Sequence, residues 1–172
     1  MLTKQDLCSM ALLKLGEQPL VSLTSDTAAA QLARTLCDVT LNSLLSSHPW
    51  RFATDAVLIE RDTDGNLIIP ENVLRILKCN GHVCGKKIFS HSDNVKLLAV
   101  VNVGVEDFPS YFISLAATRL AMEFCMPLTG NQQMFRTLVS LYESELQTAK
   151  FIDSTTDSDA GVRDFSLIDV RF

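Results

Sequence analysis

The sequence predicts a mainly α-helical α+β protein: a four-helix bundle with a small antiparallel β-rich extension and a flexible C-terminal arm. Apolar residues at helical spacing dominate the early and late parts of the chain, whereas alternating apolar residues with Asp-Gly and Asn-Gly turns occupy the middle. A polar, acidic stretch then precedes a short apolar C-terminus. We therefore expect a first bundle half (1–51), a β-rich insertion (52–105), a second bundle half (106–152) and a docking arm (153–172).

Two helices are expected in the first bundle half. Residues 3–15 begin with a capping-box pattern at Thr3–Asp6, and Gly16 stands where a C-terminal glycine cap belongs. Residues 27–47 follow a run of good N-cap residues, and His48-Pro49 ends the second helix. Apolar residues cover so much of this second helix that we expect it to be buried on two sides.

The insertion is expected to form one antiparallel sheet of four or five strands. Asp62–Asn66, which contains an Asp-Gly pair, and Asn80-Gly81 predict two hairpins. In the second hairpin, Cys79 and Cys84 would take paired positions on either side of the turn.

Helical spacing then returns in residues 109–126 and 131–152. Pro109 suits the first turn of a helix, and Pro127 followed by residues 129–131 predicts a short turn. A turn this short makes the last two helices antiparallel neighbours.

Charge and composition exclude several classes of function. Fifteen Lys and Arg stand against twenty Asp and Glu, and a net charge of −5 disfavours a protein that grips nucleic-acid phosphates tightly. No apolar run is long enough to span a bilayer, and the polar start at Met1–Asp6 predicts a product of the cytoplasm. Charged residues make up only 20% of the chain, which is typical of a protein with subunit interfaces.

No catalytic residue, metal ligand or cofactor site is predicted with positive support. Cys79, His82 and Cys84, with His91 downstream, could in principle bind zinc, but their positions beside a tight turn favour a plain hairpin. The five cysteines include three, Cys8, Cys37 and Cys125, that we interpret as small buried hydrophobes. The chain also lacks the glycine-rich and nucleophile motifs of common enzyme families, so we do not expect an enzyme.

Two segments are candidate interaction sites. A polar loop at the tip of the extension could contact a protein partner, although a solvated hairpin end explains it equally well; its residues are Lys86, Lys87, Ser90, His91, Ser92 and Asp93. The C-terminal arm could add a strand to another chain's sheet or fold back on its own domain; its apolar residues are Phe165, Leu167, Ile168, Val170 and Phe172.

The order of motifs resembles the bacteriophage head–tail adaptor proteins, including the tail tubular protein A group of short-tailed phages. The resemblance covers residues 5–165 and rests on four stretches: Leu12–Pro19, His48–Phe52, Ile69–Ile76, and Phe108-Pro109 through the following helix to Gly130. It implies a ring, commonly a dodecamer, that lies beneath the portal protein at the head–tail junction of the virion and passes DNA through its lumen. It also implies that the arm engages the portal and that the far side of the ring binds the next tail or nozzle protein.

Two alternatives remain beside the adaptor. One is a different phage neck or head-completion module, and the other is a small zinc-binding regulator or enzyme built around Cys79, His82 and Cys84. In the adaptor, an acidic lumen of the same sign as DNA would let the duplex slide rather than stick.

Overall fold

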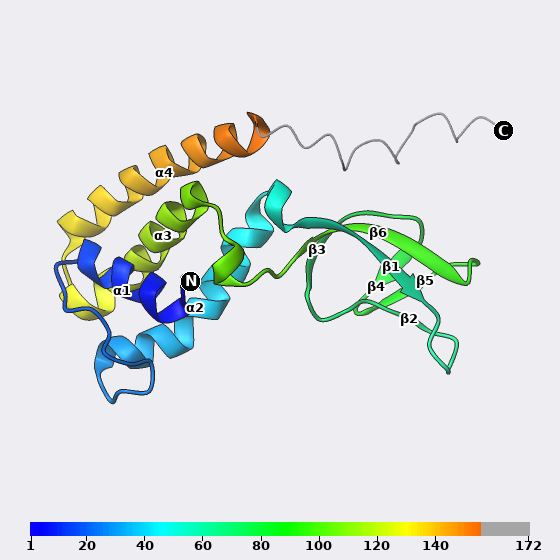
Figure 1. Cartoon of the computed structure of the whole chain (residues 1–172), viewed down its shortest axis with the longest axis horizontal. Coiled ribbons are helices and arrows are strands. Elements are labelled where there is room, and N and C mark those ends of the chain that lie inside the picture. The colour runs from blue at the N-terminus through cyan, green and yellow to red at the C-terminus, as the bar shows by residue number, and fades with distance from the viewer. Residues whose placement is uncertain (156–172) are drawn as a thin grey trace.

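Four α-helices and two three-stranded sheets make up residues 1–155, the part of the chain that the computed structural model describes (Figure 1). The helices are α1 (Lys4–Lys14), α2 (Ala28–Ser47), α3 (Ser110–Thr129) and α4 (Gln132–Thr155). The strands are β1 (Thr54–Glu60), β2 (Leu67–Ile68), β3 (Val73–Cys79), β4 (His82–Cys84), β5 (Lys87–Phe89) and β6 (Asn94–Val101). The short 3₁₀ turns η1 (Arg51–Ala53) and η2 (Val105–Asp107) join the helices to the strands. The α+β class with a β insertion between two helix pairs is confirmed.

The first two helices begin at side-chain caps. Thr3 Oγ1 accepts a hydrogen bond from the Asp6 backbone N–H at 3.1 Å, and the Asp6 carboxylate accepts one from the Thr3 N–H at 2.9 Å. This is the predicted capping box. Thr27 Oγ1 caps α2 in the same way by accepting from the Ala30 N–H at 3.2 Å.

α3 is longer than predicted. It continues through Pro127 to Thr129, because a proline in the last turn removes one backbone hydrogen bond and leaves the earlier turns intact. Gly130 then ends the helix in the left-handed conformation, with φ at 61°. α3 and α4 are antiparallel neighbours, as predicted, and Ser114 Oγ near the start of α3 donates to Glu145 Oε1 in the second half of α4 at 2.9 Å.

The prediction of a four-helix bundle is wrong. α3 lies at the centre of the helical body and packs against α1, α2 and α4, whereas α4 makes few close contacts with α1 or α2. The sequence of α3 explains this arrangement, because its buried residues surround the helix and offer an apolar surface to several partners; they are Phe112, Leu115, Ala116, Ala117, Thr118, Leu120, Ala121, Met122, Phe124 and Cys125. Three helices around one central helix, rather than four around a shared core, therefore form the helical body.

α2 is buried on one side only, contrary to the expectation of two. The side facing α3 is buried, whereas Val39 is 67% exposed and Leu32 and Leu36 are half-buried. These three residues recur at helical spacing and leave an apolar stripe on the surface of α2.

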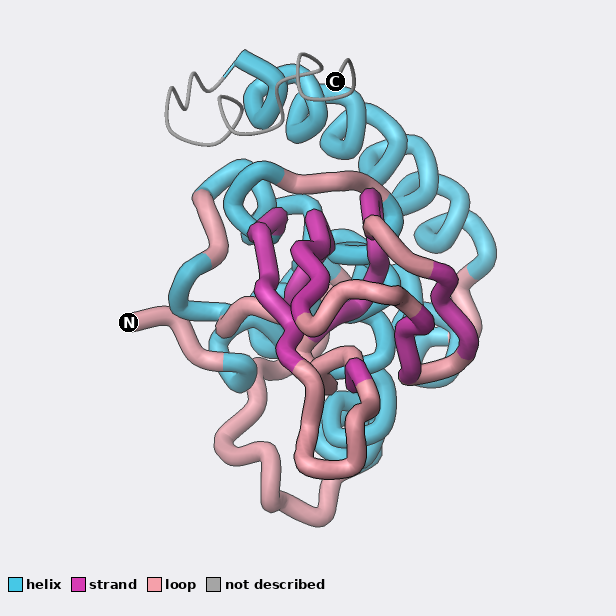
Figure 2. The backbone as a smooth tube through the Cα atoms, turned by 90° about the vertical axis from the view of Figure 1, so that its right-hand side faces the viewer, coloured by secondary structure: helices cyan, strands magenta, loops and turns pink. Residues whose placement is uncertain are grey.

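The strands form two antiparallel sheets, in the orders β1-β6-β3 and β2-β5-β4. An isolated bridge between Arg61 and Leu67 links the sheets. A second hydrophobic core, distinct from that of the helices, lies within this extension; its buried members are Ile59, Leu67, Ile69, Ile88, Val95 and Leu97. Figure 2 looks onto this end of the molecule and shows the strands in front of the helices.

β3 contributes to both cores. Leu74 and Leu77 pack against the core of the helical body, whereas Ile76 and Cys79 pack against that of the extension. Two irregularities in the pairing of β3 with β6 turn the strand between these contacts. The first sheet therefore contributes side chains to both cores.

The pairing of strands corrects the prediction of a single sheet with a hairpin at Asn80-Gly81. β3 pairs with β6 and β4 pairs with β5, so Asn80-Gly81 carries the chain from one sheet to the other. Gly81 is needed there for a close approach, since a Cβ at this position would lie 2.7 Å from Ile88 Cγ2 and 3.0 Å from the Phe89 carbonyl oxygen. The β4–β5 hairpin instead turns at Gly85, whose φ is 60°.

The end of α4 also differs from the prediction. The helix continues to Thr155, so Asp153, predicted as the first residue of the flexible arm, is helical and buried. The predicted docking residues of the arm lie outside the described residues; they are Phe165, Leu167, Ile168, Val170 and Phe172. No helix within residues 1–155 is long and apolar enough to cross a membrane.

Candidate functional site

The tip of the extension is built from a tight turn between β1 and β2 and a loop between β5 and β6. In the turn, Asp62 Oδ1 accepts hydrogen bonds from the N–H groups of Asp64 at 3.0 Å and Asn66 at 2.7 Å. Gly65 completes the turn with φ at 79°. The aspartate thus fixes the shape of the turn through its own backbone neighbours, as Asx turns do.

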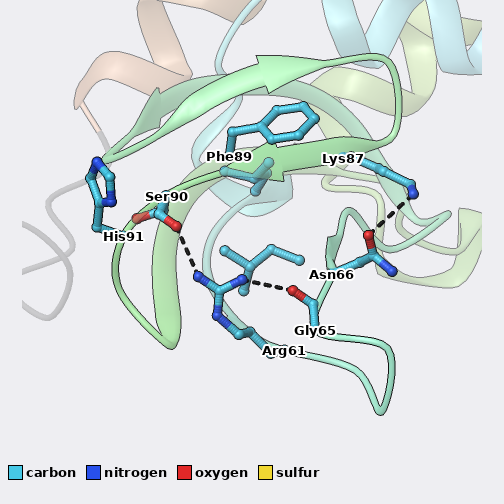
Figure 3. Close-up of a pocket in the computed structure, with 9 residues that line it drawn as sticks. Arg61, Gly65, Asn66, Lys87, Phe89, Ser90 and His91 are labelled. Carbon is cyan, nitrogen blue, oxygen red and sulfur yellow. Dashed lines mark hydrogen bonds between the residues drawn. The ribbon is translucent and has the colours of Figure 1, made fainter.

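Arg61 ties this turn to the loop that follows β5. Its Nη1 donates to the Gly65 carbonyl at 2.7 Å, and its Nη2 donates to the Ser90 carbonyl at 2.8 Å (Figure 3). The same Nη2 also donates to the Ser92 carbonyl at 3.1 Å. Its Nε lies 3.4 Å from Asp93 Oδ1. One planar guanidinium therefore holds both loops of the tip in a defined arrangement.

An open pocket of about 360 Å³ lies at this tip. Of the predicted contact residues, the structure brings Lys87, Ser90 and His91 to its lining, together with Arg61, and Lys87 Nζ donates to Asn66 Oδ1 at 3.2 Å. Ser92 and Asp93 lie in the same loop and contact Arg61.

Lys86 lies apart from the other predicted residues. It sits in the β4–β5 turn, at the opposite end of β5 from the loop, and its Nζ is 3.3 Å from Glu71 Oε1. The candidate site therefore comprises Lys87, Ser90, His91, Ser92 and Asp93, with Arg61 added and Lys86 removed.

Two exposed apolar side chains lie near this site: Phe89 lines the pocket, and Ile68 pairs with the lining residue Lys87. Phe89 is 59% exposed and Ile68 is 47% exposed. Phe89 and Lys87 are two residues apart on β5 and so lie on the same face, and Ile68 pairs with Lys87 across the strands. This face of the second sheet therefore offers an aromatic ring, an aliphatic side chain and an ammonium group beside the loop, which is a composition suited to a protein contact.

A second polar cluster lies at the junction between the helices and the extension. Asp153 is 2% exposed, and its carboxylate accepts hydrogen bonds from the Arg51 N–H at 3.1 and 3.2 Å and from the Tyr111 hydroxyl at 2.8 Å. His48 Nε2 lies 4.0 Å from the same carboxylate. The last turns of α4 are thereby fastened to η1, where the chain leaves the helical body.

The environment of this cluster shifts two pKa values. Burial lowers the pKa of His48, and the nearby Lys150 charge adds to the effect, while Asp153 opposes it. Burial and the hydrogen bond to Asp153 raise the pKa of Tyr111. The direction of each shift favours the neutral form of both groups near pH 7, and each stands close to the buried carboxylate of Asp153.

The residues weighed as a zinc site do not converge. Cys79 pairs with Leu97 in the first sheet, whereas Cys84 pairs with Lys87 in the second, so the two cysteines do not occupy the paired hairpin positions that we expected. Across residues 1–155 no group of three or more His, Cys, Asp or Glu side chains is arranged to hold a metal ion.

Two residues that organise these clusters were missed from the sequence. Arg61 precedes the Asp-Gly turn and carries no periodic signal of its own. Asp153, however, follows Ala149 by four residues and so lies on the buried face of the last helix. A carboxylate at such a position predicts buried hydrogen-bond donors, and this signal could have been used.

The tip joins two loops through hydrogen bonds to Arg61, and the carboxylate of the junction cluster accepts hydrogen bonds from Arg51 and Tyr111. No protein-family model matches the chain, and no curated protein does.

Proposed function

We propose that the protein is a bacteriophage head–tail adaptor, which forms a ring beneath the portal, connects the capsid to the tail and lets DNA pass through its lumen. The ordered set of sequence motifs carries this proposal. Two of these motifs occupy structurally demanding positions: Leu12–Pro19 ends α1, and His48–Phe52 joins α2 to the extension with Trp50 fully buried. Motifs at such positions determine where the helices end and how they connect to the extension, so a shared motif order supports a shared architecture.

The surface of α2 supports assembly into a ring. Val39 is exposed, and Leu32 and Leu36 beside it are only partly buried against the chain's own core, so a neighbouring copy could bury the rest of this apolar stripe. A ring is built from such contacts repeated between unlike faces of adjacent copies. The resemblance to adaptors favours twelve copies, and the net charge of −5 on each suits a lumen that does not retain DNA.

We assign the portal contact to the C-terminal arm and the tail contact to the tip of the extension. Apolar residues alternate with polar ones in the last part of the arm, which suits strand addition to a partner sheet. The tip projects at the far end of the extension from the helical body (Figure 1). Arg61 pre-organises its two loops, which lowers the entropic cost of binding a tail or nozzle protein.

Electron microscopy of the purified chain mixed with its portal ring tests the proposal. We expect a ring of adaptor density against the portal and none when the chain ends at Ala160. A full-length variant with Ser at all five apolar arm positions is the matched control for length, and it should also fail to bind. Normal docking of both variants would place the portal contact elsewhere, and absence of any wild-type ring would overturn the proposal.

The tail contact needs a variant that leaves the backbone of the loop intact. Replacing residues 90–93 by a short Gly-Ser link would change the backbone that presents the Ser90 and Ser92 carbonyls to Arg61 and would remove the Asp93 carboxylate, so Phe89→Ser combined with His91→Ala is the sharper change. The double variant should still dock to the portal but lose recruitment of the next tail protein. Unchanged tail assembly would exclude the tip as the contact.

A further inference from the structure

The link between the two sheets, Asn80-Gly81, contains two groups that can react with each other. An asparagine side chain closes onto the backbone nitrogen of the next residue most readily when that residue is glycine, because no Cβ hinders the approach. Asn80 is the only asparagine of the chain that precedes a glycine. The glycine is required by the fold, since a Cβ there would lie 2.7 Å from Ile88 Cγ2. The crossing between the sheets therefore retains a reactive dipeptide.

Neither of the two reacting groups is held by a hydrogen bond. Asn80 is exposed, and its side-chain amide has no hydrogen-bond partner within residues 1–155. In the same part of the chain the Gly81 N–H donates to no acceptor. β4, which follows directly, is a three-residue edge strand that is exposed along its whole length. Because such a strand opens more readily than a buried one, the Gly81 nitrogen can reach the side-chain carbonyl carbon of Asn80.

The Asp64-Gly65 pair in the tip turn could react through the same five-membered ring, but its backbone is held. The Gly65 N–H donates to the Asp62 carbonyl at 3.0 Å. The N–H groups of Asp64 and Asn66, on either side, both donate to Asp62 Oδ1. Attack by the Gly65 nitrogen would break these hydrogen bonds. The hydrogen bonds of the fold therefore separate two dipeptides that look similar in the sequence.

We propose that Asn80-Gly81 is a site of spontaneous deamidation, which converts Asn80 to isoaspartate or aspartate and loosens the attachment of β4. Isoaspartate adds one carbon atom to the main chain and one negative charge to the surface. The added atom falls between β3 of the first sheet and β4 of the second. Since Gly81 packs closely against Ile88, the longer link shifts β4 from its pairing with β5. This site does not depend on the proposed adaptor function.

The reaction has two steps and consumes one water molecule. The Gly81 nitrogen, after losing its proton to the solvent, attacks the side-chain carbonyl carbon of Asn80; a C–N bond forms and ammonia leaves. Water then opens the resulting succinimide. Cleavage of the new C–N bond gives aspartate, whereas cleavage of the original backbone C–N bond gives isoaspartate. One amide and one water become one carboxylate and one ammonium ion, and nothing is oxidised or reduced.

Peptide mapping of the full-length chain after storage in mildly alkaline buffer tests the site. Trypsin places Asn80 in residues 79–86 and Asn42, which precedes a serine inside α2, in residues 35–51. With its cysteines alkylated, the 79–86 peptide should acquire the mass of a carboxylate in place of an amide and separate into two isomers. Asn80 should react at least about tenfold faster than Asn42, which corresponds to about 1.4 kcal/mol in activation free energy. Equal rates, or an unreacted Asn80, would overturn the proposal.

Synthetic peptides of residues 79–86 and 62–75 separate the effect of the fold from that of the sequence. Asn80 should react in the folded chain at nearly its rate in the free peptide. Asp64 should isomerise at least about tenfold slower in the folded chain than in its peptide, because its turn is held by hydrogen bonds. If the fold protects Asn80 as strongly as Asp64, the structural argument is wrong.

Hydrogen exchange of residues 82–89 measures the loosening of β4. These amides should exchange faster in the stored wild-type chain than in the fresh one, whereas stored Asn80→Ala should exchange like its own fresh sample. Fresh Asn80→Asp carries the added charge without the added carbon, so it should exchange like fresh wild type. Unchanged exchange in the stored wild type, or fast exchange in fresh Asn80→Asp, would refute a shift of β4 by the longer backbone.

Discussion

Replacing Asp153 with Ala should be among the most destabilising changes on α4. The substitution removes the acceptor of the Arg51 N–H and of the Tyr111 hydroxyl, which the carboxylate binds at 2.8–3.2 Å. Hydrogen bonds to charged groups contribute about 1.5–3 kcal/mol each. Because Tyr111 and Arg51 keep partial access to water, which can replace the lost acceptor, we expect a total loss of about 2–4 kcal/mol.

Urea unfolding followed by far-UV circular dichroism measures this loss. With a slope of about 2 kcal/mol per M, the midpoint of Asp153→Ala should fall by about 1–2 M. Asp153→Asn keeps one oxygen acceptor and should lose about half as much free energy of unfolding. Ser154→Ala changes an exposed neighbour on the same helical turn and should stay within about 0.5 kcal/mol of wild type.

The hydrogen-bond argument also predicts coupling between Asp153 and Tyr111. Tyr111→Phe alone should cost about 1 kcal/mol, and in the Asp153→Ala background it should cost clearly less, because the partner is already gone. Hydrogen exchange of the amides near the end of α4 should accelerate in Asp153→Ala but not in Ser154→Ala. A midpoint unchanged by Asp153→Ala, or strictly additive effects in the double variant, would refute the reasoning.

Two further predictions concern His48 and Gly81. Since the pKa of His48 in the folded chain lies below its ordinary value of 6.5, the unfolded chain binds more protons and the free energy of unfolding should decline as the pH falls below that value; His48→Phe, which keeps a ring against Trp50, should flatten this part of the urea-midpoint profile, and a slope identical to wild type would contradict the assignment. Gly81→Ala should lose about 1–3 kcal/mol by forcing a Cβ to 2.7 Å from Ile88 Cγ2, whereas Asn80→Ala at the exposed neighbour should change little in the same unfolding measurement.

Local sequence signals predicted the elements well because each depends on a few neighbouring residues. The predicted capping box at Thr3 and Asp6 is present, whereas the cap of α2 is Thr27, the residue directly after the predicted N-cap candidates Thr24–Asp26; both caps are closed by side chains within three residues. The positions of the four helices and the strand character of the insertion follow from such patterns.

The packing of the helices was harder to predict, because it depends on which of several apolar helix faces contacts another element. The apolar circumference of α3 could have been used to predict a central helix, but the stripe on α2 was also apolar and is only partly covered within one chain. Asn80-Gly81 led to the wrong prediction of a hairpin because the contacts of this pair with distant residues cannot be seen in the local sequence. A glycine that avoids a clash with Ile88, which is distant in sequence, looks the same locally as a glycine that makes a turn.

The pattern of β3 carried information that a search for strict alternation overlooks. Its residues Val73–Cys79 repeat as two apolar residues followed by one basic residue, a period of three instead of two. That period matches a strand with irregular pairing that serves two cores. At the candidate site, Lys87, Ser90 and His91 of the predicted contact loop line one pocket, whereas the distant partners of Arg61 and Asp153 required the three-dimensional fold.

The first sheet, β1-β6-β3, contributes to both hydrophobic cores, and this has a mechanical consequence. A body and an extension joined only by loops would swing about a hinge, but here β3 and β6 are embedded in both cores at once. A push on the tip must bend a hydrogen-bonded sheet and shear side chains packed on both of its faces before the extension can tilt. We therefore expect the extension to resist bending relative to the helical body. We also expect the two cores to unfold together in a single calorimetric transition.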